Sequence, residues 1–182
     1  MSSTDSIFLR ETAAVFKQYK FLADQALVQV TGDEQFFREF GPRSNSIAAI
    51  VKHVAGNLKS RWQDFLTTDG EKPDRNRDDE FVISGADSRA ALMDRWEKGW
   101  AIVTKELEQL KEEDLGRTVT IRSEPHTVIL AIQRSLAHTT YHVGQILYLS
   151  RTVKEGEWKW LTVAPGKSAQ MNQEVRDRFS KS

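Results

Sequence analysis

Apolar residues recur at helical spacing along four long segments, and this pattern limits the possible folds more than any other feature of the chain. Apolar side chains repeat at intervals of three, four or seven residues, which is the period of an amphipathic helix. The pattern predicts helices over residues 6–31, from a cap at 44–46 to 67, from a cap at 87–88 to 111, and over 128–151. Four helices of this length are typical of a bundle, so we predict an all-α four-helix bundle.

The segments between these helices are short of helical signals. Residues 67–86, TTDGEKPDRNRDDEFVISGA, are charged, contain glycine and proline, and predict a long loop between the second and third helices. Residues 119–122 favour a short extended piece, with negligible strand content elsewhere. After the fourth helix we expect an irregular C-terminal tail with a short terminal helix from Ser168. The length of 182 residues favours a single domain spanning residues 1–182.

Two histidines four residues apart mark the fourth predicted helix. Four residues turn an α-helix through about 400°, so His138 and His142 leave the same face about 40° apart and suit two ligands of one metal ion. The chain has four histidines, which leaves His53 and His126 as candidates for a third ligand. His53 flanks the apolar stripe of the second helix, as the pair flanks its own. His126 follows Glu124-Pro125, where a helix has hardly begun, and is the weaker candidate. A histidine pair of this kind is also compatible with a structural role.

Composition excludes several classes of function. The 26 basic and 26 acidic residues give a formal net charge of zero, so nothing global attracts nucleic acid or anionic lipid. The absence of cysteine means that any metal must take nitrogen or oxygen ligands. The N-terminal segment lacks the pattern of a signal peptide, and no apolar run approaches the roughly 20 residues that span a bilayer. We therefore expect a cytoplasmic protein without nucleic-acid or membrane partners.

The segments KHVAGN and AHTTYHVGQI, with the later WLTVAPGKS, resemble a branch of the DinB-like superfamily, the domain-of-unknown-function family 1572. The resemblance covers nearly the whole chain and implies a four-helix bundle of DinB/YfiT-like type. It implies a three-histidine site of His53, His138 and His142 that binds a divalent metal, nickel or zinc. It also implies a small-molecule substrate, as some relatives transfer low-molecular-weight thiols such as bacillithiol, and a homodimer.

Three neutral imidazoles would leave open positions on a metal, where chemistry could occur. Asn57, Tyr141 and Gln145 are candidates for contacts beside that open position. Hydrolysis also needs a base, and no helical carboxylate is suitably placed, which favours thiol transfer slightly. Three acids of the long loop remain open as bases that fold back over the groove: Asp78, Asp79 and Glu80.

Two further groups of residues allow alternative interpretations. Arg61, Arg75 and Arg77 could form an anion site with the loop acids, but a mixed-charge loop is usually solvated surface. The five tryptophans could line an aromatic pocket, but core packing is the more frequent role of large aromatic residues. Three hypotheses follow for the function: a small-molecule metalloenzyme, a non-catalytic metal-binding protein, and a helical interaction protein with structural histidines.

Overall fold

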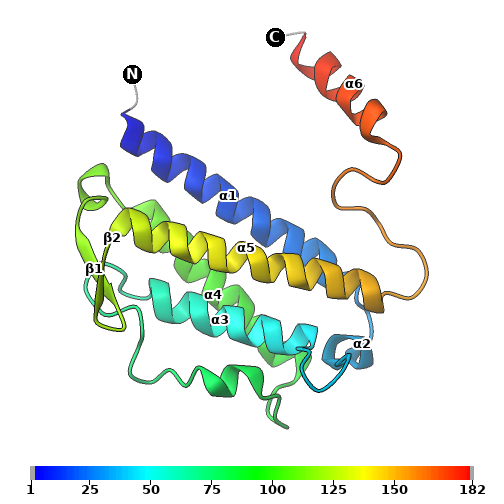
Figure 1. Ribbon diagram of the computed structural model, residues 1–182, viewed down its shortest axis with the longest axis horizontal. Coiled ribbons are helices and arrows are strands. Elements are labelled where there is room, and N and C mark those ends of the chain that lie inside the picture. Colours follow the sequence, from blue (N-terminus) through cyan, green and yellow to red (C-terminus); the bar gives the residue numbers. More distant parts are fainter. Residues whose placement is uncertain (1–2, 181–182) are drawn as a thin grey trace.

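The computed structural model of the protein describes residues 3–180 and is mostly helical (Figure 1). Its four long helices are α1 (Thr4–Leu27), α3 (Ile47–Trp62), α4 (Arg89–Gln109) and α5 (Val128–Val153). The smaller elements of this described part are α2 (Asp33–Phe37), the 3-10 helices η1 (Asp78–Phe81) and η2 (Glu112–Asp114), α6 (Ser168–Phe179), and the strands β1 (Thr118–Ile121) and β2 (Glu124–Thr127). The four long helices and the terminal helix from Ser168 are confirmed. Residues 1, 2, 181 and 182 of the predicted domain lie outside the described residues.

Each long helix begins at a hydroxyl cap. The side chains of Ser3, Ser46, Ser88 and Thr127 each accept a hydrogen bond from the backbone N–H three residues later. These bonds satisfy amide groups that have no partner within the helix. The local sequence therefore fixes where all four helices start.

The helix ends were predicted less well. The first helix ends at Leu27 and not at residue 31, and the short helix α2, which the sequence pattern did not predict, follows it. The second helix ends at Trp62 and not at residue 67, because Gln63 is extended and Asp64 has a φ of 51°. Phe65 is nevertheless buried after the helix has ended, which explains why it fitted the apolar period.

The core lies around α3, which packs against α4 and α5 while α1 packs against α5 (Figure 1). Trp62, Trp96 and Trp100 are among the largest fully buried side chains, which confirms that these tryptophans pack the core. Gly99 allows α4 to approach α3 closely, because a Cβ there would lie 3.1 Å from the carbonyl oxygen of Ala55. The close packing holds α3 at a fixed position relative to its neighbours.

The fold is mostly helical, as predicted, and the extended piece predicted at residues 119–122 is strand β1. The second strand β2 was not predicted, and the two strands form an antiparallel hairpin over residues 118–127. Its turn consists of Arg122 and Ser123, whose φ angles are 57° and 63°. Two-residue hairpin turns with positive φ at both positions normally use asparagine and glycine. The Asp69 carboxylate accepts hydrogen bonds from the backbone N–H groups of Arg122 and Ser123, each at 2.8 Å, and holds the turn.

We expect Ser123→Gly to stabilise the protein, because glycine adopts a left-handed conformation without the steric cost of a Cβ. The expected gain in the free energy of unfolding is about 1 kcal/mol, measurable by urea denaturation. Ser88→Gly is the matched control, since Ser88 has a φ of −68° and caps α4, so glycine should be slightly destabilising there. Equal effects of the two substitutions would contradict the strain assigned to the turn.

The C-terminal helix α6 buries none of its side chains and stands apart from the other helices in Figure 1. The segment before it, residues 154–167, is irregular, as predicted for the tail. None of the helices within residues 3–180 is both long enough and apolar enough to cross a membrane.

Candidate metal centre

Three histidines from two helices meet beside the long loop. His53 lies on α3, and His138 and His142 lie one turn apart on α5. Their ring centroids are 4.6 to 5.1 Å apart. One side-chain nitrogen from each of the three lies within 4.8 Å of the other two. The helical spacing that placed the pair on one face thus brings it to the histidine of the neighbouring helix.

Glu80 completes this cluster from the loop between α3 and α4. It lies in η1, is 7% exposed, and its Oε2 accepts a hydrogen bond from His53 Nδ1 at 2.8 Å. A Cβ at position 56 would overlap the Glu80 carboxylate, so Gly56 makes room for it on α3. Burial alone would raise the pKa of Glu80, but hydrogen bonds from His53 and Arg75 hold it below its usual range. Glu80 is therefore ionised, and it fixes the proton of His53 on Nδ1.

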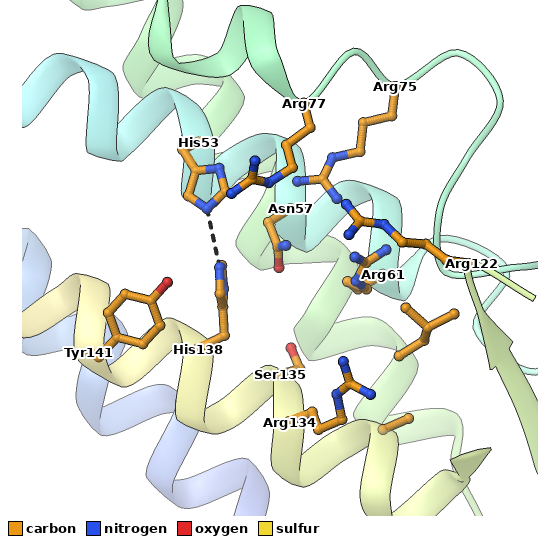
Figure 2. A pocket seen from close by; sticks show the side chains of 12 residues that line it. His53, Asn57, Arg61, Arg75, Arg77, Arg122, Arg134, Ser135, His138 and Tyr141 are labelled. Atoms are coloured by element: carbon orange, nitrogen blue, oxygen red, sulfur yellow. Dashed lines mark hydrogen bonds between the residues drawn. The ribbon is translucent and has the colours of Figure 1, made fainter. Parts of the chain in front are cut away.

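The hydrogen bonds also determine which nitrogens are free to bind a cation. With its proton on Nδ1, His53 accepts a hydrogen bond at Nε2 from His138 Nε2 at 3.1 Å, and a cation held by both nitrogens would replace that proton (Figure 2). His142 Nδ1 lies 2.8 Å from the amide oxygen Oε1 of Gln145 and must donate to it, because a carbonyl oxygen only accepts. Its Nε2 is buried and has no hydrogen-bond partner within residues 3–180. His142 thus keeps a buried, unpartnered Nε2 in a cluster where one nitrogen of each histidine lies within 4.8 Å of the other two.

The surroundings keep the α5 pair neutral. Burial, with the positive charges of nearby groups, lowers the pKa of His138 to about 3. Burial likewise lowers the pKa of His142 to about 4, although the hydrogen bond to Gln145 opposes the shift. A neutral imidazole has the lone pair that a metal requires.

These residues fit a metal ion. Imidazole nitrogens bind zinc at about 2.0 to 2.1 Å, so two of them on one cation lie about 3 to 4 Å apart. The His53–His138 separation already falls in that range, and a nitrogen of His142 lies within 4.8 Å of both. Carboxylates and amides commonly accept hydrogen bonds from the outer nitrogens of metal-binding histidines, as Glu80 and Gln145 do here. The three histidines could hold a metal ion, whose identity the donor set leaves open.

The other candidate residues lie around this cluster, except for one. Asn57 and Tyr141 line a cavity together with His53 and His138, and the Tyr141 ring packs against His138 and His142. His126, in contrast, lies on β2 and hydrogen-bonds through Nδ1 to the carbonyl of Glu124. The structure does not bring it to the other three histidines.

The sequence analysis did not predict the positions of Glu80 and of the arginines in the site. Glu80 was one of three loop acids left open, while Asp78 and Asp79 prove to be exposed. For Arg61, Arg75 and Arg77 the sequence left an anion site open and favoured solvated surface. The side chains of Arg75 and Arg61 are only 5% and 15% exposed, while that of Arg77 is 50% exposed. The charge pattern of the loop carried no signal for these differences, because they depend on the path by which the loop crosses α3.

The fold and the cluster together define a mostly helical protein with a possible three-histidine metal site. The family model of a protein family of unknown function, DUF1572, matches residues 3–167. The chain therefore belongs to this family, and α6 lies beyond the matched residues. A comparison with curated proteins found no match.

Proposed function

We propose that this protein is a metal-dependent enzyme with a DinB-like four-helix bundle, acting on a small molecule at the three-histidine site. The observation that carries the proposal is the convergence of three histidine nitrogens beside a cavity, with the Nδ1 atoms of His53 and His142 held by Glu80 and Gln145. His53 and His138 line that cavity, so a cation held by the three histidines would be open to a substrate. Purely structural histidines would not need an open cavity.

Nickel and zinc are the cations that we propose for the site. A bound divalent cation would supply Lewis-acid chemistry and favour the deprotonated form of a water or a thiol at neutral pH. Glu80 and Gln145 orient the imidazoles, and Asn57 and Tyr141 contact the substrate from the cavity wall. None of the described residues lining the cavity is acidic, so none offers a carboxylate base for hydrolysis. This favours the transfer of a low-molecular-weight thiol, which brings its own nucleophile.

The test begins with metal analysis of protein purified without a nickel column. We expect about one equivalent of a divalent metal per chain. Thiol adducts and simple esters or amides are then screened with metal-loaded and metal-stripped protein. Metal-dependent turnover supports the proposal. One equivalent of metal without turnover would identify a metal-binding protein, and no metal would indicate structural histidines.

Glu80→Gln should weaken metal binding about 10- to 100-fold, because the charged acceptor that orients His53 is lost. The measurement is a competition titration of metal-stripped protein with a chromophoric chelator. Asp79→Asn is the matched control. The substitution removes the same charge from the neighbouring residue, which is exposed and hydrogen-bonds to Asn76 and not to a histidine. Wild-type affinity in the Glu80 variant would show that the carboxylate has no part in the site.

A further inference from the structure

The cavity beside the histidines has a strongly basic wall. It has a volume of about 210 Å³ and contains five arginines: Arg61, Arg75, Arg77, Arg122 and Arg134. They come from α3, the long loop, the hairpin turn and α5, and they surround the space next to His53 and His138 (Figure 2). None of the described lining residues is acidic. From this arrangement we propose that the cavity binds an anionic group of the substrate, a phosphate or a carboxylate.

The carboxylates behind this wall are too few to balance its charge. Glu71 alone accepts ion pairs from three arginines, Arg61 at 2.9 Å, Arg75 at 3.2 Å and Arg122 at 3.1 Å. Glu80 pairs with Arg75 but is also engaged by His53. Three guanidinium groups therefore share two carboxylates. Within residues 3–180, Arg77 and Arg134 have only long ion pairs with exposed acids, Asp78 at 3.8 Å and Glu124 at 3.6 Å. Five arginines thus have four carboxylate partners in this described part of the chain, all outside the cavity lining.

Burial makes this excess of positive charge more costly, because the buried guanidinium groups have lost much of their hydration. The side chains of Arg61 and Arg75 are mostly removed from water, and a buried cation needs a partner to replace its hydration. Burial lowers the pKa of Arg61, and although Glu71 opposes this shift, the positive charges of Arg75 and Arg122 add to it. An anion in the cavity would contact these groups from the side that Glu71 does not occupy.

The hairpin turn places a further arginine at the cavity. Arg122 has a φ of 57°, although an arginine gains nothing from this conformation locally. The Asp69 carboxylate accepts hydrogen bonds from the backbone N–H of Arg122 and from that of Glu71, the latter at 2.7 Å. It thereby links the hairpin turn to Glu71, whose side chain pairs with three of the arginines. Strained backbone held by its surroundings is common at binding sites.

The chemistry of the lining indicates the kind of ligand. Guanidinium groups bind phosphate and carboxylate through two parallel hydrogen bonds, and a cavity of this size takes a small anionic group. His53 and His138 form the end of the same cavity, so the anion would position a substrate next to the proposed metal. The inference rests on the proposed function for its link to catalysis, but anion binding itself needs no metal.

The test measures the binding of inorganic phosphate and of malonate, separately, to metal-stripped full-length protein by calorimetry at constant ionic strength. We expect saturable binding of at least one of the two anions with millimolar or tighter affinity. Arg122→Gln and Arg77→Gln, both at partly exposed side chains, should each weaken it about 10-fold. Arg10→Gln is the matched control, because it removes the same charge from an exposed site on α1.

The outcomes separate this inference from the proposed function. Binding of phosphate alone or malonate alone would support the site and identify the anionic group. No saturable binding of either anion, or equal binding by folded Arg122→Gln, Arg77→Gln and Arg10→Gln variants, would overturn it. Circular dichroism establishes that each variant is folded. Anion binding in a protein that takes up no metal would support the anion site and refute the metal-dependent function. Metal uptake without anion binding would refute the anion site and leave the metal-dependent function standing.

Discussion

His138→Ala is expected to abolish stoichiometric metal binding. His138 supplies one of the three nitrogens that converge within residues 3–180, and its Nε2 lies 3.1 Å from that of His53. Two imidazoles would remain, and alanine offers no donor atom in place of the third. We expect the affinity to fall by more than about 100-fold, since even loss of an outer hydrogen-bonding partner costs 10- to 100-fold. The measurement is metal content by mass spectrometry after equilibration and gel filtration.

The matched control for this experiment is His126→Ala. His126 is also buried, but it lies on the hairpin and outside the cluster, so this variant should retain its metal. Thermal unfolding of both variants shows whether either substitution disturbs the fold. A full equivalent of metal in folded His138→Ala would contradict the assignment of the three histidines as ligands.

The sequence predicted the histidine cluster because helical periodicity fixes the direction of side chains. His138 and His142 share a face of α5 by their spacing alone, and His53 flanks the apolar stripe that packs toward that helix. Gln145 follows from the same geometry, one turn after His142. Regular elements therefore carried the information for the site wherever its residues lie on long helices.

The loop and hairpin contributions could not be predicted in this way. Glu80 is 27 residues from His53, and the path between them has no repeating pattern that would aim its side chain. The hairpin turn uses Arg122 and Ser123, without the asparagine or glycine that usually marks such a turn. Its support comes from Asp69, more than 50 residues earlier, and contacts of that kind become visible only in the folded chain.

Asp87 holds the end of the long loop between α3 and α4 against those two helices. Replacing this carboxylate should therefore lower the stability of the fold substantially. The Asp87 side chain is 2% exposed and accepts hydrogen bonds from Lys52 on α3 at 2.8 Å and Arg95 on α4 at 3.2 Å. It also accepts bonds from the backbone N–H and the hydroxyl of Ser84, each at 2.9 Å. Burial would raise the pKa of Asp87, but the bonds from Lys52 and Ser84 lower it to about 2.

The lowered pKa gives the expected size and pH dependence of the effect. A shift from 3.8 to about 2 corresponds to about 2 kcal/mol of folding stability contributed by the ionised carboxylate. Because the pKa is lower in the folded state, this contribution is fully present above pH 3.8 and is lost as the pH falls toward 2. Asp87→Asn should therefore lower the free energy of unfolding by about 2 kcal/mol at neutral pH, and by progressively less in acid.

Urea denaturation of wild type and variant at neutral pH and near the folded pKa tests this expectation. Asp74→Asn is the matched control, because Asp74 is exposed and pairs only loosely with Lys59 at 3.6 Å. A difference between wild type and Asp87→Asn that stays constant from neutral pH into acid would show that the ionised carboxylate does not stabilise the fold. If the difference shrinks as expected, the same carboxylate anchors the loop that brings Glu80 to His53, and the variant should also bind metal more weakly.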